Sequence, residues 1–160
     1  MRLWHLVVLL ALAGIYFWSG PATTMPAQTM VYYDKNSTEQ ATKRSLSCLR
    51  NRCLTIYLAP WCPYCKSSHT AILDAVKQLD ARGISTTVIL GRDKTEALLE
   101  YAADFPFPVY LDPNQAYFNQ LGMKGVPHWV VWSPGGKIIK NESGGFSSAD
   151  SLLYYLDLEE

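Results

Sequence analysis

The sequence predicts an α/β domain, a central mixed sheet flanked by helices, preceded by an N-terminal apolar helix. Strand-like runs alternate with helix-like segments over most of the chain, and a hairpin and a closing helix follow. The 160 residues are 49 % apolar and 18 % charged, with a formal net charge of zero. This composition is enough for a packed core, and it gives no basic excess that would indicate nucleic-acid binding.

The apolar stretch Leu3–Trp18 sets the first segment apart. As a helix it would span ~24 Å, slightly less than a ~30 Å hydrocarbon core. Aromatic residues at both ends favour an uncleaved signal-anchor, whereas Gly20-Pro21-Ala22 would suit a cleaved signal peptide. A buried N-terminal core helix is the third alternative. In the first two cases Arg2 stays in the cytoplasm and the domain is exported.

The chain therefore divides into three predicted parts. Residues 1–18 are a signal-anchor or signal peptide, residues 19–30 a small, polar, proline-containing tether, and residues 31–160 the α/β domain.

Strands are predicted where short apolar, β-branched or aromatic runs are bounded by turn residues. These runs are residues 31–33, 54–58, 84–90, 108–112, 128–132 and 137–140. The last two flank Ser133-Pro134-Gly135-Gly136, which predicts a hairpin.

Helices are predicted from apolar spacing and from capping residues. The expected helices are residues 38–49; a segment with Ile72, Leu73, Val76 and Leu79 on one face, ended by Gly83; residues 93–103, opened by Asp93 and Glu96; a helix opened by Asp112-Pro113-Asn114-Gln115; and a last helix with Leu152, Leu153 and Leu156, capped by Ser147 and Asp150.

The motif Trp61-Cys62-Pro63-Tyr64-Cys65 lies between a predicted buried strand and a predicted helix. Cys62 would then sit at the amino end of the helix, where free N–H groups and the helix dipole stabilise a thiolate. Cys65, one turn further, could resolve a mixed disulfide formed by Cys62. A purely structural disulfide would close a very short loop, and a zinc site would need two more ligands, so both alternatives are weaker.

The motif "WCPYC" after a buried strand, "GVPHW" some sixty residues later and the Pro-Gly-Gly hairpin resemble the thioredoxin superfamily. The likeness covers about residues 31–158 and mixes features of its TlpA-like and Dsb-like branches. It implies that Pro127 is cis and lies against the cysteine pair, and that Trp61 and the Val126 backbone contact an extended substrate peptide. The alternative for Pro127 is a proline that merely starts a strand.

The resemblance also shows a departure. Thioredoxins carry a buried acid six positions before the first cysteine, and that position is Ile56 here. Two histidines are candidates for tuning the thiols. His69 lies four residues after Cys65, on the same helix face; the alternative is that it has no role in the chemistry. His128 would stabilise the Cys62 thiolate as a cation; the alternative is that it contacts substrate at the surface.

Cys48 and Cys53 form a second possible pair, with the spacing C-x4-C. In an exported domain we expect a structural disulfide. An electron-relay pair and two free thiols stay open as alternatives.

Together these features predict an exported, membrane-tethered thiol–disulfide oxidoreductase, favouring a reductase, with no cofactor and no metal. Its expected partners are protein thiols and disulfides of the cell envelope, a redox partner protein, and the membrane through residues 3–18, but no nucleic acid. The expected location is periplasmic, tethered to the inner membrane, or soluble in the periplasm after cleavage. The alternatives are a disulfide oxidant or isomerase, a peptide-binding or assembly module, and a redox sensor.

Overall fold

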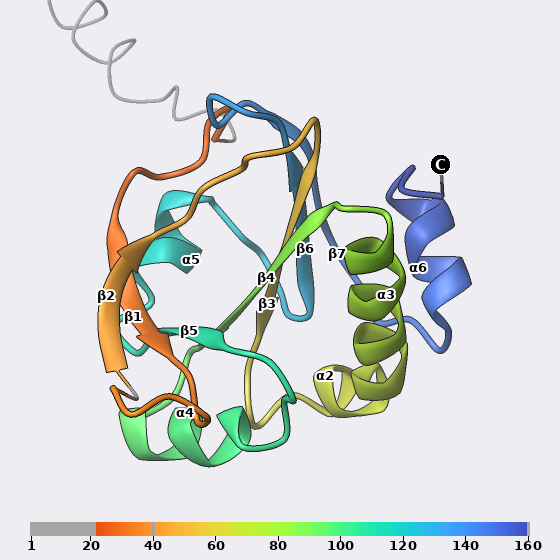
Figure 1. Cartoon of the computed structure of the whole chain (residues 1–160). Coiled ribbons are helices and arrows are strands. Elements are labelled where there is room, and N and C mark those ends of the chain that lie inside the picture. Colours follow the sequence, from red (N-terminus) through yellow and green to blue (C-terminus); the bar gives the residue numbers. More distant parts are fainter. Residues whose placement is uncertain (1–21, 40, 160) are drawn as a thin grey trace, which may run out of the picture.

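The computed structural model describes residues 22–39 and 41–159 (Figure 1). Seven strands form one sheet: β1 (Thr29–Tyr33), β2 (Ala41–Ser45), β3 (Cys53–Leu58), β4 (Ser85–Gly91), β5 (Val109–Asp112), β6 (His128–Trp132) and β7 (Ile138–Ser143). Their order is β2-β1-β5-β4-β3-β6-β7. The pairs β3–β4 and β4–β5 are parallel and the other neighbours antiparallel, so the sheet is mixed, as predicted.

Helices cover both faces of the sheet (Figure 1). They are α2 (Pro63–Ser67), α3 (His69–Ala81), α4 (Thr95–Ala102), α5 (Ala116–Gln120) and α6 (Ala149–Tyr155). Buried side chains of α3, α4 and α6 join one core cluster, and those of α5 join the other. We call the two sides the α3 face and the α5 face of the sheet.

The central strand β3 is buried over its whole length, because neighbours on both edges and helices on both faces cover it. Its side chains alternate between the two clusters: Ile56 belongs to the α3 face and Tyr57 to the α5 face. The Tyr57 hydroxyl donates a hydrogen bond of 2.9 Å to the buried carboxylate of Asp112, at the end of β5. The parallel strands β3, β4 and β5 thus end at one edge, where the cysteine motif begins.

The prediction of a helix over residues 38–49 is wrong. Residues 41–45 form β2, an edge strand paired antiparallel with β1 (Figure 1). Four of its five side chains are exposed, so there was no buried apolar stripe to hold a helix. The hydrogen bonds to β1 decide the structure, and these come from a distant partner that local pattern does not reveal.

Two of the predicted helix starts also need correction. Asp93 does not cap α4: the helix begins at Thr95 with Lys94 before it, and the Asp93 carboxylate accepts the Lys94 N–H. Ser148, not Ser147, caps α6 and accepts the N–H of Ser151.

Asp112 does stabilise the start of α5, but across a longer loop than predicted. The helix begins at Ala116, and one carboxylate oxygen of Asp112 accepts the N–H groups of Tyr117 and Phe118. Gly83 ends α3 in the left-handed conformation, φ 72°, as predicted.

The predicted tether extends too far toward the domain. The Met25 N–H donates to the Gly136 carbonyl and the Ile138 N–H to the Thr23 carbonyl, so residues 23–25 lie along the start of β7. Met30 is buried within β1. The folded domain therefore includes residues before 31, the predicted boundary.

The predicted N-terminal apolar helix lies outside the described residues. Among residues 22–39 and 41–159, no helix is both long and apolar enough to cross a membrane.

Candidate active site

Cys62 and Cys65 are free thiols at the point where β3 turns into α2. The Cys62 N–H donates to the Ala59 carbonyl, which closes the turn. Cys62 is the N-cap of α2, and its sulfur accepts the N–H of Cys65 at 3.3 Å. Pro63 occupies the first turn, where a missing N–H costs nothing, as predicted. The backbone thus directs a helix N–H at the Cys62 sulfur.

The two thiols differ in their surroundings. Cys62 is 3 % exposed, whereas Cys65 is completely buried in the cluster on the α3 face. Burial is the main cause that raises the pKa of Cys65, since the apolar core disfavours the thiolate. At neutral pH Cys65 is therefore a thiol.

The peptide bond between Val126 and Pro127 is cis, which confirms the predicted isomer of Pro127. The thiol of Cys62 donates a hydrogen bond of 3.3 Å to the Val126 carbonyl. The segment before β6 therefore lies directly against Cys62.

Exposed aromatic side chains and a glycine-containing loop surround the contact between Cys62 and Val126. Trp61 and Tyr64 are 51 % and 68 % exposed, although both are large and apolar. A side chain at Gly145 would meet Tyr64 and Ser68 at 3.3–3.4 Å, so the loop after β7 comes close to α2. The Phe146 N–H donates to the hydroxyl of Ser68, which fixes this loop.

Tyr101 on α4 is a residue near the thiols that sequence reasoning missed. Its side chain is 8 % exposed, and within the described part of the chain its hydroxyl has no hydrogen-bond partner. Burial raises the pKa of Tyr101, and the nearby Cys65, Asp104 and Cys62 raise it further. Helical spacing from Leu98 could have placed Tyr101 in the core, but not beside the cysteines.

Ile56 stands six positions before Cys62, where thioredoxins have a buried acidic residue, and it is fully buried on the α3 face. His69 begins α3, and its ring lies edge-on to Phe105 with the ring centroids 5.0 Å apart. Phe105 belongs to the same cluster as Cys65. His69 is thus near the core around the thiols, and a packing contact is what the structure shows for it.

His128 does not lie as the sequence led us to expect. Neighbouring Trp129 is in the cluster on the α3 face and Val130 in that on the α5 face, so alternation puts His128 on the α5 face, away from Cys62. Its ring hydrogen bonds to the Asn141 side chain on β7, and burial lowers the pKa of His128. The ring is therefore neutral at neutral pH, and it is 4 % exposed, which removes both of its predicted roles.

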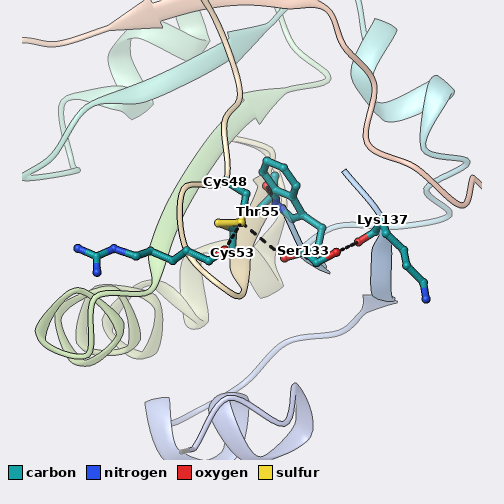
Figure 2. Close-up of a disulfide and its surroundings, with 7 residues drawn as sticks. Cys48, Cys53, Thr55, Ser133 and Lys137 are labelled. Carbon is teal, nitrogen blue, oxygen red and sulfur yellow. Dashed lines mark hydrogen bonds between the residues drawn. A yellow bond between two sulfur atoms is a disulfide. The ribbon is translucent and has the colours of Figure 1, made fainter. Parts of the chain in front are cut away.

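Cys48 and Cys53 form a disulfide, with a Cα–Cα distance of 5.7 Å (Figure 2). Cys53 starts β3 and is buried, while Cys48 is half-buried, with its sulfur 3.8 Å from the Trp132 carbonyl. The Trp132 indole donates to the Thr55 hydroxyl at 3.0 Å, so the bridge lies over a hydrogen-bonded part of the sheet (Figure 2). The bond fastens the loop before β3 to the strand itself.

This disulfide and the free pair lie at opposite ends of β3. Cys53 is the first residue of the strand, and Cys62 comes after its last residue, Leu58. Six strand residues span about 20 Å, too far for sulfur atoms of the two pairs to exchange within one molecule. A direct relay between the pairs in one chain is therefore excluded by distance.

A metal site needs clustered ligands. Within the part of the chain that the structure describes, no three His, Cys, Asp or Glu side chains are grouped to hold a metal ion.

The sequence model of the Redoxin family matches residues 21–155. None of the curated proteins matches the chain by sequence. Among solved structures, DsbF of Mycobacterium tuberculosis is 18 % identical with a TM-score of 0.64, over 84 % of this chain and 98 % of that one.

Two further structures are similar. One, described as a thiol:disulfide interchange protein DsbE from Chlorobium tepidum, is 19 % identical with a TM-score of 0.63, over 87 % of this chain and 99 % of that one. The other, a secreted disulfide oxidoreductase of Mycobacterium tuberculosis homologous to DsbE of E. coli, is 15 % identical with a TM-score of 0.62, over 82 % and 95 %. At these identities the likeness shows a shared fold.

Proposed function

We propose that this chain, which belongs to the Redoxin family, is a thiol–disulfide oxidoreductase with Cys62 and Cys65 as its redox pair. The observation that carries this proposal is the position of two free thiols one helical turn apart, with the Cys62 sulfur against the cis Val126–Pro127 segment. Trp61, Val126 and Pro127 then form the surface that receives the substrate chain.

The reaction is a pair of exchanges. The Cys62 thiolate attacks one sulfur of a substrate disulfide, which forms a mixed disulfide and releases the first substrate thiolate. Cys65 gives its proton to water or to the released thiolate and attacks the Cys62 sulfur, which forms the Cys62–Cys65 disulfide and releases the second thiolate. Two electrons pass from the pair to the substrate, and a dithiol partner protein must return two to regenerate the pair.

We favour the reductase direction. A disulfide is strongly oxidising when its reduced form is stabilised, as by a cation next to the nucleophilic thiolate. Here His128 is neutral and lies on the other face of the sheet, and burial keeps Cys65 protonated. The reduced pair thus lacks the predicted histidine charge, which supports a low, reducing potential.

We also propose that the domain works outside the cytoplasm, tethered by residues 3–18, or soluble after cleavage. The Cys48–Cys53 disulfide supports this because such bonds persist in oxidising compartments. A related fold belongs to a secreted oxidoreductase. Its natural partners would then be proteins of the cell envelope. Fractionation of cells should find the chain with membranes or in the periplasm; recovery in the cytosol would contradict this proposal.

Equilibration with a graded dithiothreitol buffer tests the redox pair. We expect a reversible Cys62–Cys65 disulfide with a potential nearer ~−270 mV than ~−120 mV, the values of a reductant and an oxidant of this superfamily. Cys62→Ser should abolish reduction of insulin, while Cys48→Ser with Cys53→Ser serves as the matched control and should retain it. Absence of a reversible disulfide would contradict the assignment.

A further inference from the structure

We propose that Arg92 is a specificity-determining residue that selects substrates carrying an acidic residue next to their reactive cysteine. This inference rests on the proposed function of Cys62 and Cys65 and names the chemistry of the substrate that they would meet.

Arg92 contacts the cysteine motif through its backbone. It follows β4 in the left-handed conformation, φ 63°, and its carbonyl accepts the indole N–H of Trp61 at 2.9 Å. Trp61 directly precedes Cys62. The backbone of Arg92 thus holds the exposed ring beside the nucleophile.

The side chain of Arg92 is held in place by aromatic rings. Its guanidinium carbon lies 4.5 Å from the ring centroid of Phe118 and 5.4 Å from that of Trp61. Contacts with two ring faces fix the position of a guanidinium and leave its N–H groups free at the edge of the plane. The charge is therefore presented next to Trp61 rather than spread over a mobile side chain.

Arg92 has no carboxylate close enough to neutralise it. Among residues 22–39 and 41–159 the one ion pair within 4.0 Å joins Lys140 to Asp157. The adjacent Asp93 carboxylate accepts the Lys94 N–H, and the buried Asp112 carboxylate accepts hydrogen bonds from Tyr57, Tyr117 and Phe118; neither forms an ion pair with Arg92. A half-buried guanidinium without a carboxylate in direct contact can pair with an incoming anion.

Two exposed lysines near the motif have the same sign as Arg92, whereas Asp104, which acts on Tyr101 together with the two thiols, has the opposite sign. Exposed Lys66 follows Cys65 directly, and exposed Lys124 lies two residues before Val126. Arg92 also lines an open groove of about 500 Å³, where Arg92 and Lys94 balance the charges of Asp93 and Glu96. On the side of the cysteines Lys66 and Lys124 outnumber Asp104, and a carboxylate on the substrate next to its cysteine is the group that fits.

Two synthetic peptides provide the test. Each has one cysteine as a mixed disulfide with 2-thiopyridine, flanked by glutamate in one peptide and by lysine in the other. The reduced full-length protein attacks the peptide sulfur and releases 2-thiopyridone, whose absorbance gives a rate constant for each peptide.

We expect Arg92→Gln to lower the ratio of the glutamate rate to the lysine rate about fivefold, the effect of one partly screened charge pair. Arg92→Lys should retain most of the ratio. Arg50→Gln removes the same charge from the exposed loop at the other end of β3, and should leave the ratio unchanged.

A second measurement does not depend on any variant folding. With the wild-type protein the preference for the glutamate peptide should shrink as salt is added, because salt screens the pairing. An unchanged ratio in Arg92→Gln, or equal losses for both peptides, would overturn the inference while leaving the redox pair intact. If wild type releases 2-thiopyridone no faster than Cys62→Ser, the proposed function fails, and this inference with it.

Discussion

At the scale of single residues, the two thiols of the motif differ in their contacts and in their burial. Cys62 caps α2, where a helix N–H points at its sulfur, and contacts the Val126 carbonyl. Cys65 is one turn further into the core and fully buried. Under the proposed function, Cys62 is the sulfur that meets the substrate, and burial keeps Cys65 a protonated thiol.

Alkylation of the reduced protein should reveal this difference. Only the thiolate reacts, so the raised pKa of Cys65 should make its modification by iodoacetamide at pH 7 slower than that of a cysteine in an unfolded peptide. The rate should still be rising with pH above ~8.5, where the peptide cysteine levels off. Peptide mapping by mass spectrometry after short labelling times measures this. Labelling of Cys65 at the rate of the peptide cysteine would contradict the burial argument.

At the scale of elements, β3 joins the two cysteine pairs. The Cys48–Cys53 disulfide closes a short loop before the strand, and the free pair follows its other end. The bridge fastens this loop close to Thr55 (Figure 2), whose hydroxyl accepts the indole N–H of Trp132 on the neighbouring strand β6. This position suits a bond that stabilises the sheet and takes no part in the chemistry.

Replacing both bridge cysteines, Cys48→Ser with Cys53→Ser, should lower the free energy of unfolding by ~2 kcal/mol, because a loop of this size restricts the unfolded chain little. Urea denaturation of the oxidised protein measures the loss. The reduction potential of the Cys62–Cys65 pair should be unchanged. Slower re-reduction of the Cys62–Cys65 pair by its dithiol partner in this variant would favour the electron-relay alternative, acting between molecules.

β2 was predicted as a helix because its own residues do not show that it pairs with β1. Residues 41–45 are mostly exposed, so their side chains carry little pattern. The strand exists because its backbone pairs with β1, which in turn pairs with β5. By contrast, β3 is fully buried and made mostly of apolar, β-branched and aromatic residues, and it was predicted within one residue.

At the scale of the whole molecule, the described chain enters the domain at the end opposite to the free thiols. Residues 23–25 lie along the hairpin between β6 and β7, and Cys53 pairs with Trp132 near that hairpin. The free pair is at the far end of β3. A tether attached here would leave the cysteine pair directed away from its anchor.

Two shortened chains test the boundary of the domain. A chain starting at residue 22 should melt at the temperature of the full-length protein. A chain starting at residue 31 should melt several degrees lower, because it loses the pairing of residues 23–25 and the first two residues of β1, Thr29 and the buried Met30. Equal melting temperatures for the two chains would mean that residues 22–30 contribute nothing to the fold.

The sequence by itself determined the features that depend on neighbours along the chain. The buried run before the cysteines, the cap position of Cys62, the place of Pro63 and the turn at Gly83 follow from local backbone preferences, and the structure has each of them. The motif likeness added the cis bond before Pro127 and the fold.

Only the tertiary structure decided what depends on distant contacts. It placed His128 on the face away from Cys62, because a shift of one residue along a strand reverses the side. It brought Tyr101 to the thiols and Arg92 to Trp61 across gaps of some thirty residues or more. These side chains come from separate elements, and the packing of those elements, which no local pattern records, brings them beside the pair.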